Sequence, residues 1–215
     1  MTIIPTHNLS LFADDLPTAS SKAELLHIPD ADIRLYRNAF GQTEADLLLN
    51  ELAETIDWQQ QKIKFFGKLI DLPRLTAWYG DTGKTYIYSG IRTDPKPWTP
   101  LLSKIRRRVE DVCGSTFNSV LLNYYRDGKD SVSWHADDEP ELGMAPVIGS
   151  VSFGATRAFH FKHRWNNKLG AKIDLTHGSL LLMAGLTQKN WLHQIPKISK
   201  FIGPRINLTF RTILP

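Results

Sequence analysis

A histidine and an aspartate stand two positions apart in the stretch SVSWHADDE, residues 131 to 139. Alternate residues of a β-strand point to the same side, so His135 and Asp137 should project together, while Trp134, Ala136 and Asp138 project to the other side. An imidazole and a carboxylate that converge on one point can bind a metal ion. The His-x-Asp pattern is a weak signal by itself and requires a third ligand from elsewhere in the chain.

A second histidine would complete a recognisable set. Two histidines and one carboxylate on one face of an octahedron leave positions open for a co-substrate and O₂ at ferrous iron. Position or predicted orientation disfavours five of the other histidines, which are His7, His27, His160, His163 and His177. His193, in the strand-like run NWLHQIP, is therefore the best candidate for the third ligand.

The stretch RINLTFR alternates between two kinds of side chain. Its polar face would carry Arg205, Asn207, Thr209 and Arg211, and its apolar face Ile206, Leu208 and Phe210. A polar face is ordinary where it meets solvent, but the apolar flank TILP also favours an interior face that holds an anion. Two arginines at the ends of roughly 20 Å of extended strand could address both ends of a short dicarboxylate.

Asn123 and Tyr125 in LLNYYRDG share a face by the same alternation. They offer an amide and a phenol to the same ligand.

Two helices precede these segments. Residues 43 to 58 place apolar side chains on one stripe behind a predicted Thr43 cap, which is typical of a helix that docks on a core. A second helix is expected from Thr99 and Pro100, a cap followed by proline in the first turn.

The pattern changes at about residue 117 to eight short β-rich runs separated by turn residues. This predicts a mainly β fold with flanking helices, specifically a double-stranded β-helix (jelly roll) core. Residues 65 to 90, rich in aromatics and turn residues, are expected to form a lid of hairpins or loops beside the barrel mouth.

Length and composition predict one domain. The 215 residues, 42% of them hydrophobic, suffice for one large core, with residues 1–30 as a loosely ordered or surface-packed leader and residues 31–215 as the domain. The single Cys113 and the lack of a long apolar run predict no membrane contact and a cytoplasmic protein.

Residues 1 to 60 carry ten acids and three bases, whereas the remainder carries 23 bases and twelve acids. That basic part suits nucleic acid, although a solubilising surface explains it about as well.

The ordered set N-x-Y, H-x-D, a distant His and R-x-N-x-T-F-R resembles the AlkB family of iron(II)- and 2-oxoglutarate-dependent dioxygenases that repair alkylated nucleic acid. The subgroup acting on double-stranded DNA is the most similar, through PRLTAWYGDTGKTYIYSG, NYYRDGKDSVSWHADDE, SVSFGATRAFHFKH, HGSLLLM and PRINLTFR. The resemblance covers roughly residues 60 to 215. It implies a nucleotide-recognition region at about 60–95 and a jelly-roll core at about 117–215.

The resemblance implies roles for the residues found above. Fe(II) would be held by His135, Asp137 and His193, while 2-oxoglutarate would be held by Asn123, Tyr125, Arg205, Asn207, Thr209 and Arg211. With O₂, 2-oxoglutarate would be converted to succinate and CO₂, and hydroxylation of an N-methyl group would release formaldehyde. The targets would be bases of the 1-methyladenine and 3-methylcytosine type.

The resemblance also implies contacts to the substrate. The residues expected around the flipped base are Tyr86, Tyr88, Ser89, Asp138 and Glu139. Those expected on DNA are Phe66 as a wedge in the base stack, with Gly67, Lys68, Arg74, Lys197 and Lys200. The similar animal proteins carry three consecutive basic residues where this chain has KISK. The expected partner is double-stranded DNA bound by a monomer, at the nucleoid or, in a eukaryote, in the nucleus.

Two other functions remain open from the sequence. One is a 2-oxoglutarate oxygenase that acts on RNA or protein, and the other is a non-catalytic, cupin-like binding module that keeps a metal or anion pocket. At several single positions, a purely structural role is an alternative to the predicted contact with the substrate. Tyr86 and Tyr88 could be strand core, Phe66 a buried side chain, and Glu139 a solvated turn acid.

Overall fold

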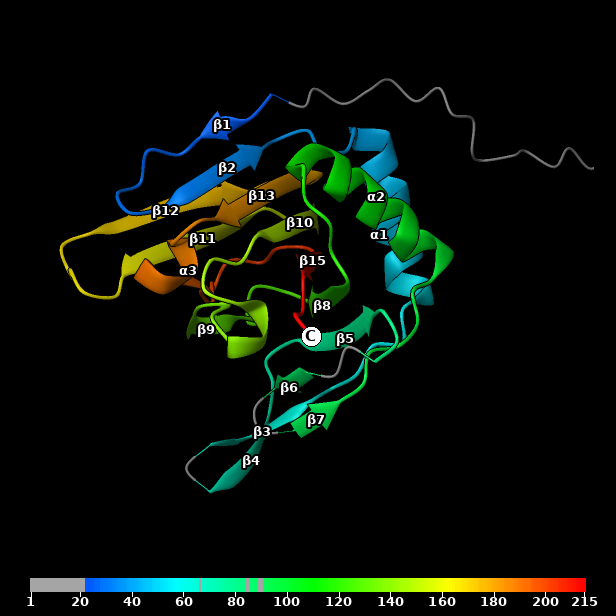
Figure 1. The fold of residues 1–215 in the computed structure, drawn as a ribbon. Coiled ribbons are helices and arrows are strands. Elements are labelled where there is room, and N and C mark those ends of the chain that lie inside the picture. The colour runs from blue at the N-terminus through cyan, green and yellow to red at the C-terminus, as the bar shows by residue number, and fades with distance from the viewer. Residues whose placement is uncertain (1–21, 66, 84–85, 89–90) are drawn as a thin grey trace, which may run out of the picture.

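The fold is a pair of antiparallel sheets packed face to face, with two helices on the outer side of the larger sheet (Figure 1). The computed structural model describes residues 22–65, 67–83, 86–88 and 91–215. All eight β-rich runs predicted beyond residue 117 are strands, and together they form the predicted jelly roll.

The larger sheet has seven strands in the order β1-β2-β13-β10-β15-β8-β5. These are β1 (Glu24–Leu25), β2 (Asp32–Tyr36), β13 (Ser179–Ala184), β10 (Ile148–Gly154), β15 (Arg205–Arg211), β8 (Ser119–Tyr125) and β5 (Leu75–Gly80). The smaller sheet has the order β12-β11-β14-β9. Its strands are β12 (Gly170–Leu175), β11 (Arg157–His163), β14 (Trp191–Ile195) and β9 (Val132–His135).

Strand β15 lies inside the larger sheet between β10 and β8, and both of its faces are buried. Ile206, Leu208 and Phe210 pack into the core beneath the helices. The alternate side chains, which the sequence placed on a polar face, point to the space between the two sheets, where they line a cavity. The interior position predicted for this polar face is thus confirmed.

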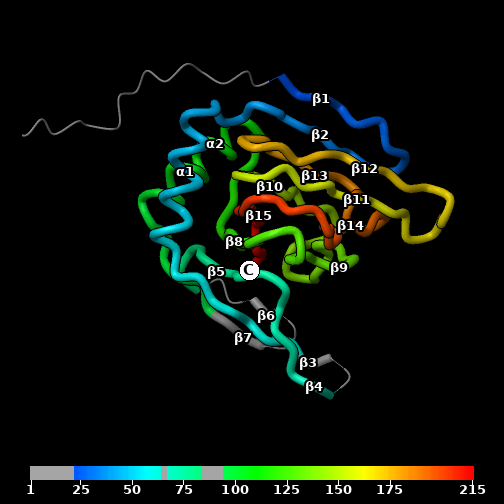
Figure 2. Tube along the Cα trace, turned by 180° about the vertical axis from the view of Figure 1, so that it is seen from behind, coloured from blue at the N-terminus to red at the C-terminus, as the bar shows by residue number. Residues whose placement is uncertain are grey.

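The two long helices lie side by side across the larger sheet, as Figures 1 and 2 show from opposite sides. Helix α1 (Gln42–Thr55) buries Ala45, Leu48 and Leu52 on the predicted stripe. Its predicted cap was wrong: the N-cap is Gly41, which makes no side-chain bond, and Thr43 lies inside the first turn. The cap of α2 (Pro100–Cys113) is confirmed, because the Thr99 hydroxyl accepts from the Leu102 amide at 3.1 Å.

Short elements complete the chain. They are the hairpin strands β3 (Lys62–Phe65), β4 (Lys68–Asp71), β6 (Tyr86–Tyr88) and β7 (Ile91–Thr93), the 3₁₀ turn η1 (Pro140–Leu142) and helix α3 (Thr187–Asn190). The β3–β4 hairpin extends beyond the sheets in both views (Figures 1 and 2), and Ile63 and Ile70 on it line the cavity. A hairpin beside the cavity mouth is what the sequence predicted there.

The residues before the domain are only partly described. Within the leader predicted for residues 1–30, β1 pairs with β2 at the edge of the larger sheet, so this part of the leader packs on the surface of the domain. Among the described residues, none of the helices has the length and apolarity needed to span a bilayer.

Candidate metal centre

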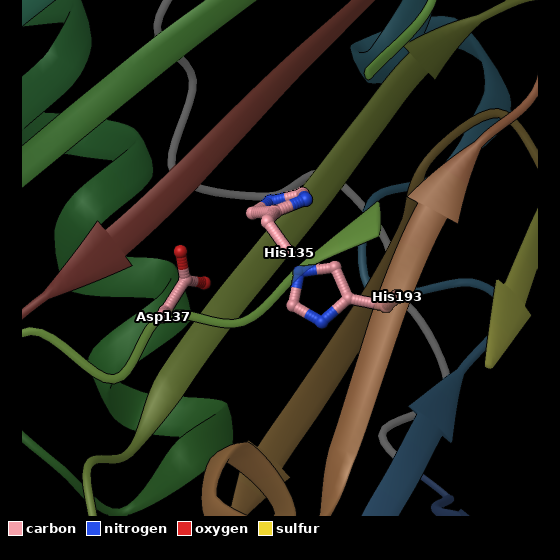
Figure 3. Close-up of side chains that lie close together, drawn as sticks. All are labelled: His135, Asp137 and His193. Atoms are coloured by element: carbon pink, nitrogen blue, oxygen red, sulfur yellow. The ribbon is translucent and has the colours of Figure 1, made fainter. Parts of the chain in front are cut away.

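Three potential metal ligands meet between the sheets. One ligand atom each from His135, Asp137 and His193 lies within 4.8 Å of the others (Figure 3). His135 ends β9 and His193 lies directly across from it on β14, so strand pairing brings the two imidazoles together with ring centroids 4.3 Å apart. The structure therefore assembles the three side chains that the sequence analysis selected.

The two imidazoles are held in different ways. Nδ1 of His135 lies 2.8 Å from the carbonyl oxygen of Ser133, a bond that assigns the proton to Nδ1 and leaves Nε2 as a lone-pair donor. His193 is buried and stacks on Phe159, with ring centroids 5.0 Å apart. Both rings are thus oriented before any ion binds.

Asp137 lies beyond the end of β9, so strand geometry alone does not orient it. Its backbone amide donates to Oε1 of Gln188 at 3.0 Å, and its carboxylate accepts from Nη2 of Arg211 at 2.6 Å. Gln188 belongs to α3 and is almost fully buried. The sequence analysis did not identify this glutamine, because no local pattern links it to a residue 51 positions away.

The protonation states suit a cation. Burial alone would raise the pKa of Asp137, but the charges of Arg211, His193 and His135 outweigh it and lower the pKa to about 2. Burial and the neighbouring His135 lower the pKa of His193 to about 3. At neutral pH the cluster therefore offers a carboxylate and a neutral imidazole, the forms that bind metal.

A cavity of about 490 Å³ opens from this cluster along the polar face of β15. Arg205 lies at the end of that face and is 1% exposed. Its Nη2 donates to Oγ of Ser152 at 2.8 Å, and its guanidinium lies over the ring of Tyr125 at 5.1 Å. Nε and Nη1 are buried with no hydrogen-bond partner in the described part of the chain.

Unsatisfied guanidinium donors beside a metal-competent cluster fit an anionic ligand that also reaches the metal. Burial lowers the pKa of Arg205 to about 10, so the side chain remains a cation at neutral pH. A short dicarboxylate such as 2-oxoglutarate has the charge and length for this cavity, and the donor set of two histidines and one carboxylate suits Fe(II).

All six residues predicted for the co-substrate line this cavity, namely Asn123, Tyr125, Arg205, Asn207, Thr209 and Arg211. Asn207 differs from the others, because its amide nitrogen donates to both Oγ of Ser150 and the carbonyl of Val151. Both amide hydrogens are used within the sheet. The geometry therefore makes Asn207 a fixed part of the cavity wall, with no amide hydrogen left to donate to a co-substrate.

The two acids expected at the substrate base are separated by the structure. Glu139 lines the cavity, and its Oε2 is buried without a hydrogen-bond partner among the residues described. It reaches the cavity from the N-cap of η1, although the strand that was expected to carry it ends at His135. Asp138 is exposed and pairs with Arg164, so it does not face the cavity as the base contact required.

The residues predicted to contact DNA, and the remaining residues predicted around the flipped base, fall into three groups. Lys197 is exposed and lines the cavity mouth, while Gly67, Lys68 and Lys200 are exposed outside it. Phe66 and Ser89, together with the side chains of Tyr86 and Tyr88, lie outside the described residues. The prediction that Arg74 contacts a DNA phosphate was wrong. Arg74 is 4% exposed and bonded to Asn123 inside the cavity, so it cannot reach a phosphate at the surface.

Comparison with known proteins agrees with this geometry. Residues 32–211 match the 2OG-Fe(II) oxygenase superfamily. The chain is 44% identical over 190 residues to the DNA oxidative demethylase ALKBH2 of Bos taurus, an alignment that covers 84% of this chain and 68% of that protein. It is 43% identical to ALKBH2 of Homo sapiens, over 83% of this chain and 72% of that protein.

A second group of relatives is equally similar. The human alpha-ketoglutarate-dependent dioxygenase alkB homolog 3 is 44% identical, over 84% of this chain and 66% of that protein. Among solved structures, OsALKBH1 superposes with a TM-score of 0.63 at 16% identity, covering 89% of this chain and all of that one, which supports the fold.

Proposed function

The chain belongs to the 2OG-Fe(II) oxygenase superfamily and within it to the AlkB family, and we propose that it repairs N-alkylated bases in DNA by oxidative dealkylation. It is an Fe(II)- and 2-oxoglutarate-dependent dioxygenase. The observation that carries the proposal is the His135, Asp137 and His193 cluster facing a cavity whose wall holds buried arginine donors.

The three clustered side chains would hold Fe(II), which leaves part of the coordination sphere open to the cavity. When bound, iron with 2-oxoglutarate and O₂ supplies the oxidant that hydroxylates an N-methyl carbon, after which formaldehyde leaves the base. Arg211 keeps the Asp137 carboxylate ionised and fixed in direction. Arg205 would bind the distal carboxylate of 2-oxoglutarate through the donors that have no other use.

The cavity mouth suits a cationic base. Methylation at N1 of adenine or N3 of cytosine blocks pairing and adds positive charge, which lowers the cost of unstacking the base. Glu139 would accept a hydrogen bond from the exocyclic amine, because it lines the cavity and its buried Oε2 has no hydrogen-bond partner in the described residues. An acid at this position favours a cationic or amine-bearing base over an uncharged one.

The surface around the mouth supports double-stranded DNA as the substrate form. Strand β4 exposes Leu69 and Ile70, at 70% and 42%, next to the cavity, and Lys197 and Lys200 are exposed on the loop after β14. Lysines would contact phosphates, while an apolar hairpin can enter a base stack opened by flipping. Phe66, which joins β3 and β4 in the sequence, would be the wedge, and a monomer would suffice for this contact.

A formaldehyde assay tests the proposal. Purified protein with Fe(II), ascorbate and 2-oxoglutarate should release formaldehyde from 1-methyladenine and 3-methylcytosine oligonucleotides, and His135→Ala should abolish release. If methylated RNA or a methylated protein is turned over and DNA is not, the substrate is RNA or protein and the proposal of DNA repair is wrong. If 2-oxoglutarate is consumed under none of the conditions, the protein is a non-catalytic binding module.

A duplex comparison tests the wedge. Phe66→Ala should reduce activity on double-stranded oligonucleotides more than on single strands of the same sequence, because only the duplex leaves a gap in the stack to fill. Leu47→Ala, on an exposed position of α1, is the matched control. Equal losses on both substrates would contradict the wedge role.

A further inference from the structure

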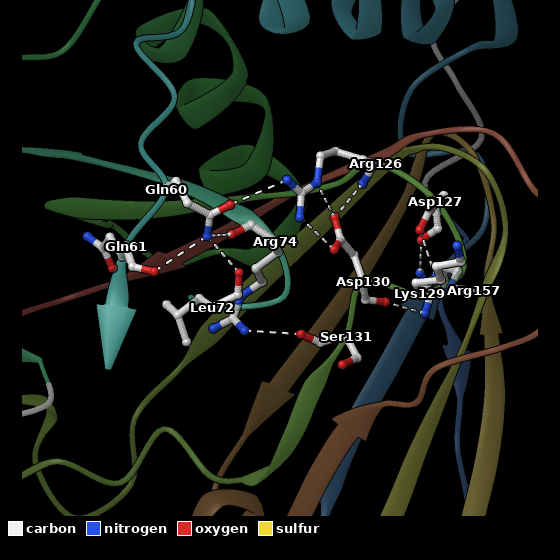
Figure 4. Close-up of polar contacts among 10 residues, drawn as sticks. All are labelled: Gln60, Gln61, Leu72, Arg74, Arg126, Asp127, Lys129, Asp130, Ser131 and Arg157. Carbon is white, nitrogen blue, oxygen red and sulfur yellow. Dashed lines mark hydrogen bonds and ion pairs between the residues drawn. The ribbon is translucent and has the colours of Figure 1, made fainter. Parts of the chain in front are cut away.

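Arg74 lies between the β3–β4 hairpin and the cavity wall. It follows β4 in the chain and directly precedes β5, whose Thr76 pairs with Asn123 of β8. Its side chain turns inward, and Nε donates to Oδ1 of Asn123 at 2.6 Å. Nη1 donates to the carbonyl of Ser131 at 3.1 Å (Figure 4). Asn123 lies in the part of the wall where the sequence analysis expected 2-oxoglutarate.

The chemistry of the two side chains fixes the direction of the amide. A guanidinium has five donors and no acceptor, so only the oxygen of Asn123 can face Arg74. The amide nitrogen of Asn123 is then directed away from Arg74 on a side chain that lines the cavity, and no described residue accepts a hydrogen bond from it. The cavity therefore receives a donor from this position.

The direction matters because the expected ligand is an anion. An amide nitrogen stabilises a carboxylate by a hydrogen bond to a charged group, whereas a flipped amide would present its oxygen and repel it. We infer that Arg74 is a positioning residue for the co-substrate, which holds the Asn123 amide with its nitrogen toward 2-oxoglutarate. The inference rests on the proposed function for the identity of the ligand.

Arg74 is itself held from several sides. Its backbone amide donates to the carbonyl of Leu72 at 2.8 Å, and the neighbouring Gln60 side chain donates to the same carbonyl at 2.7 Å. Gln60 also accepts from Arg126, which pairs with Asp130 in the loop that leads to Ser131 (Figure 4). Hydrogen bonds thus hold the backbone that carries Arg74, while Asn123 and Ser131 hold its guanidinium, as a positioning role requires.

The test measures co-substrate binding without turnover. Under anaerobic conditions, the Fe(II)-loaded protein is titrated with 2-oxoglutarate, and the Kd is read from the visible charge-transfer band. Arg74→Met should raise this Kd by about ten- to a hundredfold, the loss expected for one hydrogen bond to a charged group. Asn123→Ala should have a similar effect, and the double variant should be no worse than either single variant, because both remove the same contact.

Two further variants separate positioning from general damage. Arg34→Met removes a guanidinium from an exposed ion pair with Asp32 and none from the cavity wall, and it should leave the Kd within twofold. Asn123→Asp keeps an acceptor for Arg74 and removes the donor, so it should bind 2-oxoglutarate at least as weakly as Asn123→Ala. This variant tests the amide direction even if Arg74→Met fails to fold.

Three results would overturn the inference: an unchanged Kd in Arg74→Met, a double variant whose loss is the product of the single losses, or wild-type affinity in Asn123→Asp. A wild-type protein that binds Fe(II) but develops no band with 2-oxoglutarate would instead contradict the proposed function. The two failures are therefore distinguishable in one set of titrations.

Discussion

Replacing Arg205 by methionine should weaken co-substrate binding and leave the free protein as stable as before or more so. The guanidinium is 1% exposed, and burial lowers its pKa from the ordinary 12.5 to about 10. At 1.36 kcal/mol for each pH unit, holding the charge in this place costs roughly 3 kcal/mol. Among the described residues no carboxylate forms an ion pair with it that would offset this cost.

The interactions of Arg205 that the substitution removes stabilise the protein by less than the cost of burying the charge. Methionine removes one hydrogen bond to Ser152, worth about 1 kcal/mol, and a contact with the Tyr125 ring worth about 1 to 2 kcal/mol. The net change in the free energy of unfolding should therefore lie between 0 and about 2 kcal/mol of added stability. In contrast, 2-oxoglutarate would lose two charge-assisted hydrogen bonds of about 1.5 to 3 kcal/mol each, which raises its Kd by roughly 10² to 10⁴.

Denaturant unfolding with and without the co-substrate measures both effects. At a hundred times its Kd, 2-oxoglutarate should stabilise the Fe(II)-loaded wild-type protein by about 2.7 kcal/mol and the Arg205→Met protein by almost nothing at the same concentration. Arg34→Met, which removes an exposed ion pair with Asp32, is the control and should change neither quantity by more than about 1 kcal/mol. A variant more than about 2 kcal/mol less stable than wild type, with 2-oxoglutarate binding intact, would refute the reasoning.

Three more predictions follow from the metal cluster. Asp137→Ala should abolish formaldehyde release from 1-methyladenine oligonucleotides, and unaltered turnover would remove Asp137 from the ligand set. Gln188→Leu should weaken Fe(II) binding by about ten- to a hundredfold in a metal titration, because Asp137 loses the contact that orients it; unchanged affinity would deny that role. The metal-free protein should lose stability as the pH falls from about 6.5 to 3, by up to about 1.4 kcal/mol per pH unit for each of the two groups that contribute. Over that range the unfolded chain protonates His193 and, below about pH 4, Asp137, whereas the native state does not. Urea titrations across this range should show a smaller slope in His193→Leu, and an equal slope would contradict the assignment.

The sequence by itself determined the features that depend on strand alternation. Residues two apart on a strand share a face, so RINLTFR already separated the cavity-facing arginines from the apolar side chains that pack beneath the helices. The same rule brought Asn123 and Tyr125 to one wall. The eight strands and the Thr99 cap were also predictable, because both depend on short stretches of chain.

Only the tertiary structure decided the contacts between segments that no local pattern connects. Asp137 lies past the end of its strand and takes its direction from Gln188 and Arg211, which are 51 and 74 residues further along the chain. Arg74, taken from the sequence as a surface contact to DNA, is buried because β5 pairs with β8 and turns it toward Asn123. A charged residue shows its type in the sequence, but whether it faces solvent or a buried partner depends on which strands fold beside it.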